Sequence, residues 1–313
     1  MIELRKEKNL FEFSIAAIIP CLNEETTIKA TINNFKKNIS NIDIYVCDNG
    51  SSDKTEFIAQ KEGAFVILEQ KKGKGAAVDR LFQTVEADYY VMVDGDNTYD
   101  LSTLESNIKL MISEHTDMIV GVRKAKEKNV FPFGHQLGNK LFNLVIEICF
   151  GKGFSDVLSG YRILSKKFVK NYPNLAQEFD IEVEMSVHAL EINCKILEVQ
   201  IDYFRRPCHS TSKLRTFVDG FKILSRIFIL LIDNKPILIF LSLSLFFLIL
   251  SIISLLPVFT YWLENGTVPR MPTLILGLVL IIISFISIFF GIILESTSRQ
   301  RKEIKKIIFK TTS

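Results

Sequence analysis

Apolar and polar positions alternate in blocks over the first 234 or so residues of the 313-residue chain. Short apolar runs predict strands near residues 15–19, 42–47, 64–68, 89–93 and 117–120. Stretches between them have helical spacing, as in Ile28, Ile32 and Phe35, or open with glycines, as in 73–87. Residues 23–26 and 51–53 read as helix caps. This alternation predicts an α/β domain with a mostly parallel sheet covered on both faces.

Two long apolar runs close the chain, at residues 236–259 and 272–294, and neither contains a charged side chain. At about 1.5 Å per residue, each run reaches roughly 35 Å as a helix, enough to cross a bilayer core of about 30 Å. We therefore expect an integral membrane protein with two spans joined by a linker at 260–271.

Basic residues are concentrated on the C-terminal side of the second span. The linker holds just Glu264 and Arg270, whereas the tail at 295–313 carries six Lys and Arg residues against two acids, Glu295 and Glu303. By the positive-inside rule, both termini are expected to be cytoplasmic. The net charge of +3 gives no reason to propose a nucleic-acid partner. The five cysteines lack CxxC spacing, which argues against a disulfide framework or a zinc site.

The segment before the first span is amphipathic. Residues 214–232 combine cations with a strong apolar face, which is typical of a helix lying in the membrane interface. A helix packed on the soluble domain would have the same pattern. Residues 136–150 predict a second helix of this kind.

Polar residues follow the predicted strands, where parallel sheets bind ligands. Asp94 and Asp96 flank Gly95 directly after a buried strand. Two carboxylates in so tight a turn can hold Mg²⁺ or Mn²⁺ and bridge it to a diphosphate. The same sequence is also common in solvated acidic turns.

Two other loops favour a nucleotide. Residues 71–75 place lysines and glycine amides at the start of a helix, an arrangement that favours phosphate binding. The spacing differs from that of a P-loop, and an ordinary exposed loop could have the same sequence. Residues 48–51 can hydrogen-bond a base or ribose, or simply cap the helix that follows.

Taken together, the motifs resemble the family-2 glycosyltransferases with the GT-A fold, and more narrowly the polyprenyl-phosphate glycosyltransferases. The resemblance covers nearly the whole soluble part. Its motifs are IIPCLNEE (18–25), CDNGSSDKT (47–55), GKGAAV (73–78), VMVDGDNTYD (91–100), IVGVR (119–123), HxLGN (135–139), SDVLSGYR (155–162), FDIEVEM (179–185) and RPCHSTSKLRTFVDG (206–220).

The resemblance implies a domain plan: a cytoplasmic GT-A catalytic domain at 1–210, a juxtamembrane amphipathic helix at 211–235, two transmembrane helices within 236–294 and a basic cytoplasmic tail at 295–313. It also implies the partners, namely a nucleotide sugar, first of all a UDP-sugar, together with polyprenyl phosphate and membrane lipid. The cofactor would be Mg²⁺ or Mn²⁺. A homo-oligomer stays open.

Roles for single residues follow from the same resemblance. The expected nucleotide-binding residues are Pro20, Asn23, Glu24, Asp48, Gly50, Ser51, Lys74, Gly75, Asp94, Gly95 and Asp96. The expected catalytic residues are Asp94, Asp96, Arg123, Arg206 and Lys213, with Asp94 and Asp96 as metal ligands. The sugar and the acceptor phosphate would meet Asp156, Ser159, Gly160, Ser212 and Lys213.

Two positions depart from the relatives. Thr98 stands where mannose-transferring relatives commonly have a glutamine metal ligand, so the third ligand is open. Gln136 replaces a frequent arginine, and Lys140 is the candidate substitute for its contact to the acceptor phosphate.

The expected reaction is direct displacement with inversion, because a lipid monophosphate is already an anionic nucleophile and needs no strong base. Three alternatives remain. The chain could act on another lipid, extend a polysaccharide, or bind nucleotide sugars without catalysis. The polysaccharide reading is weakened because the only tryptophan, Trp262, lies in the predicted outer linker rather than in a QxxRW motif.

Overall fold

The computed structural model describes residues 10–126, 135–151, 153–173, 181–206, 225, 228–268 and 270–312. The chain divides into two compact units. The first comprises residues 1–217 and 305–313, and the second comprises residues 218–304.

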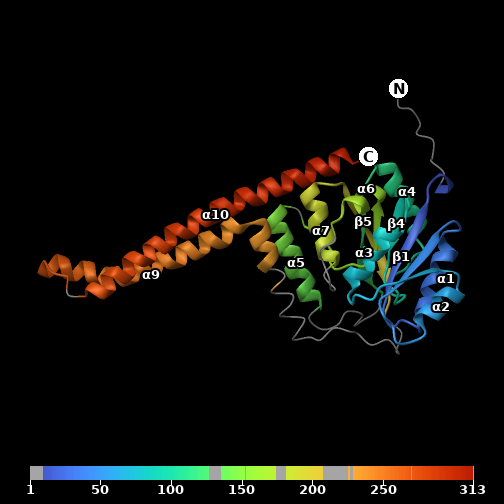
Figure 1. The fold of residues 1–313 in the computed structure, drawn as a ribbon, viewed down its shortest axis with the longest axis horizontal. Helices are drawn as coiled ribbons and strands as arrows, with labels where there is room; N and C mark the ends of the chain where they lie inside the picture. Colours follow the sequence, from blue (N-terminus) through green and yellow to red (C-terminus); the bar gives the residue numbers. More distant parts are fainter. Residues whose placement is uncertain are drawn as a thin grey trace, which may run out of the picture. The chain divides into compact units, whose positions relative to one another are not determined.

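The first unit is built on a seven-stranded mixed sheet in the order β3-β2-β1-β4-β6-β5-β7 (Figure 1). The strands are β1 (Ile15–Cys21), β2 (Asp43–Asp48), β3 (Phe65–Leu68), β4 (Tyr89–Met92), β5 (Met118–Ala125), β6 (Arg162–Ser165) and β7 (Ile196–Tyr203). Only β6 runs antiparallel to its neighbours β4 and β5. The predicted fold class is confirmed, and all five predicted strands are present.

Strands β6 and β7 were not among the predicted strands. β6 has only four residues and includes a fully buried arginine, Arg162, so hydropathy does not mark it. β7 alternates apolar and polar residues at the sheet edge and pairs with β5 over eight residues, Met118 with Ile196 through Ala125 with Tyr203. The pattern of alternating strands and helices therefore predicted the first five strands along the chain but not the last two.

Helices cover both faces of the sheet. α1 (Ile28–Asn38), α2 (Thr55–Lys61) and α4 (Leu104–Glu114) share one apolar core with alternate residues of the strands, such as Ala17 and Val91. α3 (Lys74–Thr84) contacts β1 and β2 on the other face, where its Phe82 packs edge-on against Tyr90. α1 begins at Ile28, later than the predicted cap at 23–26, because those residues form the loop between β1 and α1, where Asn23 accepts a hydrogen bond from Ser52 in the loop after β2.

Three more helices belong to this unit: α5 (His135–Phe150), α6 (Lys166–Asn171) and α7 (Ile181–Ile192). The last turns of α10, residues 305–312, pack on α6 and α7. Lys305 pairs with Glu191 at 2.5 Å, and Lys167 lies 4.7 Å from the ring centre of Phe309. His188 is buried beside the rings of Phe168 and Tyr172, as expected for a packed side chain rather than a ligand.

The second unit holds two long apolar helices, α9 (Pro236–Asn265) and most of α10 (Met271–Thr311), which run side by side (Figure 1). Both are long and apolar enough to cross a membrane. The helices exceed the predicted spans because they continue past the C-terminal end of each apolar run, to Asn265 and to Thr311. Trp262 therefore lies in α9 and not in a linker, and the predicted tail continues the helix of α10.

Small and hydroxyl-bearing side chains line the contact between α9 and α10. The hydroxyl groups of Ser244 and Ser284 are 2.8 Å apart, and Ser251 donates to the carbonyl of Gly277 at 2.8 Å. A Cβ atom at Gly277 would lie 2.4 Å from Leu255 Cδ2, so only glycine allows this approach.

Most of the predicted juxtamembrane helix at 211–235 lies outside the described residues, but 228–234 are helical. The end of this piece is capped by α10, since Ser298 and Arg301 donate to the carbonyl of Asp233 at 2.7 and 2.8 Å.

Candidate active site

The candidate site lies at the carboxyl end of β4, where the chain turns into Asp94. Because β6 runs antiparallel to β4, the loop that precedes β6 lies at the same edge. This loop approaches so closely that a Cβ atom at Gly160 would lie 2.4 Å from Asp94 Oδ2. Tyr99 fixes the approach by accepting the Gly160 N–H at 2.8 Å. The antiparallel strand thus delivers residues 156–161 to the predicted metal ligands.

Lys74 joins two acidic residues in this site. Its ammonium group forms ion pairs with Asp94 and with Glu182, the second residue of α7. Burial acts to lower the pKa of Lys74, but the two carboxylates outweigh it and raise that pKa well above its ordinary value. For Asp94, burial acts to raise the pKa, yet Lys74 dominates and the pKa is lowered. Lys74 and Asp94 are therefore both charged at neutral pH.

Asn49 holds the loop that presents Lys74. Its side-chain amide donates to the carbonyl of Lys71 at 2.7 Å, and its oxygen accepts the N–H of Gly73 at 2.7 Å. Gly73 has φ +124°, a conformation that side chains disfavour, and it is the N-cap of α3. Gly75 lies in the first turn of the same helix. The N-terminus of α3 therefore lies next to Asp94, an arrangement that would suit a bound phosphate.

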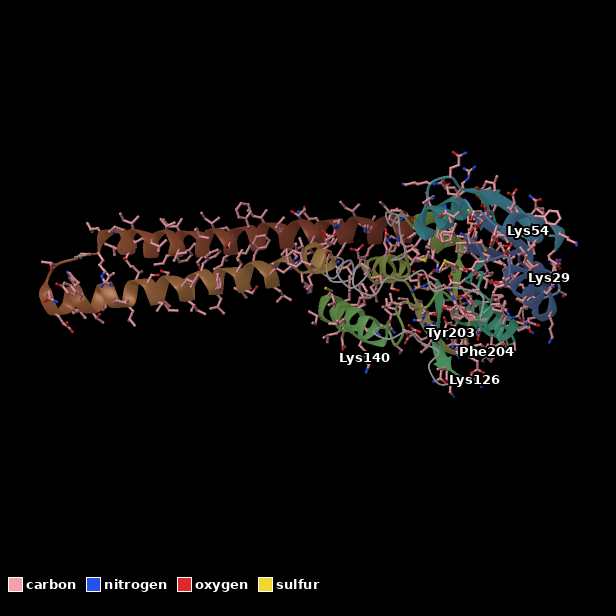
Figure 2. The ribbon with its side chains drawn as sticks, turned by 90° about the horizontal axis from the view of Figure 1, so that it is seen from below. Lys29, Lys54, Lys126, Lys140, Tyr203 and Phe204 are labelled. Carbon is pink, nitrogen blue, oxygen red and sulfur yellow. The ribbon has the colours of Figure 1, made fainter. Side chains whose placement is uncertain are left out.

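Asp96 is held by a second cation. Its Oδ2 accepts from Arg206 Nε at 2.7 Å and lies 2.6 Å from Arg206 NH2. Burial acts to lower the pKa of Arg206, but Asp96 outweighs it and raises that pKa. Arg206 lies three residues after the end of β7. The chain is fixed at this point because the N–H of Phe204 donates to the carbonyl of Thr98 at 2.8 Å. Tyr203 and Phe204 are labelled in Figure 2.

Thr98 hydrogen-bonds Asp96, which does not make it a third metal ligand. Its hydroxyl donates to Asp96 Oδ1 at 2.7 Å, its N–H lies 3.2 Å from the same oxygen, and the residue is fully buried. Both carboxylate oxygens of Asp96 therefore accept hydrogen bonds from other residues.

Arg123 and Asp156 form a further ion pair, in which both side chains are only 6% exposed. Asp156 Oδ2 accepts from Arg123 Nε and Oδ1 from Arg123 NH2, each at 2.7 Å, while Asn139 of α5 donates to Oδ1 at 3.0 Å. Arg123 also lies 5.5 Å from the ring centre of Tyr203. Burial acts to lower the pKa of Arg123, but its neighbours raise it. Asp156 therefore positions Arg123 beside the site.

The nucleotide side of the site is formed by the loops after β1 and β2. Asn23, with φ +52°, accepts the N–H of Ser52 at 2.8 Å, and its own N–H donates to Ser51 Oγ at 2.8 Å. Asp48 is 5% exposed; its Oδ2 accepts the Ser51 N–H at 3.1 Å, while its Oδ1 has no hydrogen-bond partner among the described residues. A buried carboxylate oxygen without a partner favours a ligand that donates an N–H or O–H.

The other predicted residues fall around this framework. Pro20 lies in β1, Gly50 turns with φ +78°, and Ser159 is buried beneath Gly160. Glu24 packs beside Gly95, where its Cγ would be 3.7 Å from an added Cβ atom. Ser212 and Lys213 lie outside the described residues. Lys140 is exposed on α5.

Three residues of the site were missed by sequence reasoning: Glu182, Tyr99 and Arg162. Glu182 and Tyr99 lie within quoted motifs, but no role was assigned to them. Arg162 is fully buried and binds the carbonyl of Val157 at 2.8 Å, so it holds the loop that carries Asp156 and Gly160. A charged residue inside a buried strand is the signal that could have found it.

The donor set suits a hard divalent cation. Among the described residues no group of three His, Cys, Asp or Glu side chains is close enough to hold a metal on its own. Mg²⁺ and Mn²⁺ commonly need only one or two carboxylates when substrate phosphates complete the shell. Asp94 and Asp96 supply two such carboxylates, and both are compensated here by cationic side chains. The residues therefore fit a cation that arrives with a diphosphate.

The chain is similar to known glycosyltransferases. Residues 16–172 match the model of glycosyl transferase family 2. Protein RfbJ of Shigella flexneri is 46% identical over 125 residues, covering 40% of this chain and 97% of RfbJ. A dolichyl-phosphate hexose transferase of Haloferax volcanii is 26% identical over 206 residues, covering 66% of this chain and 89% of that protein.

A solved structure shares the fold. Glucosyl-3-phosphoglycerate synthase from Mycobacterium tuberculosis, in complex with Mn²⁺, uridine diphosphate and glucosyl-3-phosphoglycerate, superposes with a TM-score of 0.56 at 20% identity. The match covers 72% of this chain and 81% of the synthase.

Proposed function

Because the chain belongs to glycosyl transferase family 2, we propose that it moves a hexose from a nucleoside diphosphate sugar to polyprenyl phosphate. The observation that carries the proposal is the acidic pair Asp94 and Asp96, each bound by a cation at the carboxyl edge of the sheet. Such a group of opposite charges can exchange its partners for a diphosphate and a divalent cation.

Asp48 bears on the base of the donor. A carboxylate accepts hydrogen bonds but does not donate them, so Asp48 Oδ1 would accept from a base that carries a ring N–H, as uracil does. We propose uracil first, in line with the uridine diphosphate bound by the structurally similar synthase.

Asp94 and Asp96 would hold Mg²⁺ or Mn²⁺, which supplies positive charge to the departing nucleoside diphosphate. Lys74 and Arg206 carry fixed charge at the same place and are suited to contact the diphosphate oxygens. Arg123, oriented by Asp156, adds a third cation at the sugar side. Together these side chains stabilise the charge that develops on the leaving group.

The acceptor supplies the nucleophile. An oxygen of the lipid monophosphate attacks the anomeric carbon, the bond to the nucleoside diphosphate breaks, and the configuration inverts. The phosphate oxygen is already anionic at neutral pH, so no side chain has to remove a proton. The protein's contribution is then to align the two phosphates and the sugar. Lys213, in the motif that follows Arg206, is the proposed contact to the acceptor phosphate.

The lipid acceptor also fits the two apolar helices. α9 and α10 would anchor the enzyme, with both termini on the cytoplasmic side as the basic residues after Leu294 indicate. The relative from Haloferax volcanii, a dolichyl-phosphate hexose transferase, supports the same class of acceptor.

The test uses the purified full-length chain in lipid nanodiscs with UDP-glucose, UDP-N-acetylglucosamine or GDP-mannose. We expect release of the nucleoside diphosphate from one donor only when polyprenyl phosphate and Mg²⁺ or Mn²⁺ are both present. Release with a different lipid acceptor, or none with any donor while nucleotides still bind, would reject the proposal and favour one of the alternative activities.

A further inference from the structure

Lys74 forms an ion pair with Asp94, the carboxylate that a divalent cation would also use as a ligand. Asp94 Oδ2 lies against the backbone of Gly160, and Oδ1 is paired with the ammonium of Lys74. The side chain of Asp94 is 27% exposed, while those of Lys74 and Glu182 are only 14% and 6% exposed. The lysine therefore reaches Asp94 from inside the protein, and the open side of the carboxylate faces outward.

Glu182 gives Lys74 a second, more deeply buried partner. If Lys74 leaves Asp94, its ammonium still has the Glu182 carboxylate and is not left unpaired in a buried place. Arg206 occupies Asp96 in a similar way, and its exposed fraction of 34% lets it turn toward a ligand. A diphosphate offers several anionic oxygens that can receive both cations.

We propose that Lys74 competes with the divalent cation for Asp94 and that Glu182 is the positioning residue that holds Lys74 once the cation binds. It follows that the cation binds weakly alone and more tightly when a diphosphate is present. This inference rests on the proposed function, because it takes Asp94 and Asp96 as the ligands of that cation.

The test measures Mn²⁺ binding to the full-length protein by electron paramagnetic resonance, first without nucleotide and then with saturating UDP. A protein-free titration corrects for Mn²⁺ bound by UDP itself. The central variant is the double substitution Lys74→Met with Glu182→Gln, which removes the competing ammonium without changing the net charge. The matched control is Lys109→Met with Glu105→Gln, an exposed Lys–Glu pair on α4.

For the unmodified protein, we expect UDP to tighten Mn²⁺ binding by about tenfold or more. The double variant should bind Mn²⁺ alone about tenfold more tightly than the unmodified protein and should show weaker coupling to UDP. Glu182→Gln alone should bind Mn²⁺ more weakly, because Lys74 then keeps only Asp94. The control pair should leave both measurements unchanged.

An unchanged Mn²⁺ affinity in a folded double variant overturns the inference and leaves the proposed function standing. If the double variant does not fold, Glu182→Gln decides: an affinity equal to or tighter than that of the unmodified protein overturns the inference. If the unmodified protein binds no Mn²⁺ even with UDP, the metal assignment in the proposed function falls, and the inference falls with it.

Discussion

The sheet domain and the pair of long helices use opposite means to fix their structure. In the sheet domain, ion pairs join residues far apart in the sequence, such as Asp96 with Arg206 and Arg123 with Asp156. In the helix pair, the contacts come from hydroxyl groups and glycines, such as Ser244 with Ser284. Charge is concentrated at the sheet edge where we propose that phosphates bind, whereas hydrogen bonds and close packing join the two apolar helices.

The strongest way to break this comparison is to neutralise one site carboxylate. Asp96→Asn should lower sugar transfer by about 100-fold or more, because the divalent cation that stabilises the leaving group would lose one of its two protein carboxylates. The measurement is nucleoside diphosphate release with polyprenyl phosphate, together with a thermal melt to confirm folding. Undiminished turnover in a folded variant would mean that the acidic pair has no catalytic role.

A second change separates structural charge from catalytic charge. Asp156→Ala removes the carboxylate that pairs with the buried guanidinium of Arg123. It should reduce the free energy of unfolding by about 3–5 kcal/mol. Denaturant unfolding of the full chain would measure the change. The exposed pair on α4 serves as the control, because Glu105→Ala should cost at most about 0.5 kcal/mol. Similar losses for the two variants would show that burial of the Arg123 pair has no special effect.

His188 tests a buried titratable group outside the ion pairs. Burial, with Lys305 nearby, lowers its pKa from 6.5 to about 4. The unfolded chain therefore binds more protons between these pH values, and stability falls as pH drops from about 6.5 toward 4, by at most about 3 kcal/mol from this residue. His188→Phe should flatten that part of the profile of melting temperature against pH. The exposed His115→Gln should not, and equal slopes in the two variants would contradict the assignment.

The smallest expected effect lies in the helix pair. Ser244→Ala removes the hydrogen bond to Ser284 between the helices and should destabilise the pair by about 0.6 kcal/mol. Ser254→Ala is the matched control, since that hydroxyl bonds only the carbonyl of Leu250 in its own helix. Unfolding in mild detergent with added SDS would compare the two. A larger loss from Ser254→Ala would contradict the contact between the helices.

Local patterns in the sequence predicted the fold class, the first-half strands and the apolar helices, because each rests on hydropathy within a short window. The acidic pair and the Lys74 loop were also predictable, since glycines and charges after a strand mark a ligand edge. The sequence could not pair Lys74 with Glu182, which lies 108 residues away and reaches the site only through the start of α7. It also missed β6, where a buried arginine interrupts the apolar pattern.

The departure at Thr98 shows what structure adds to a motif. Sequence comparison left the third metal ligand open at this position. In the structure, the hydroxyl of Thr98 instead orients Asp96, a role that depends on the turn after β4 and not on the residue type alone. Ligands beyond Asp94 and Asp96 would then come from the diphosphate, as Mg²⁺ sites commonly allow.

The most direct measurement of the central claim is mass spectrometry of the lipid product formed from a panel of nucleotide sugars and polyprenyl phosphate. The account predicts one new glycolipid, a hexose joined to the lipid phosphate with inverted configuration, formed only with a divalent cation and absent with Asp96→Asn. A panel that yields no glycosylated polyprenyl phosphate from the folded, nucleotide-binding protein would contradict it.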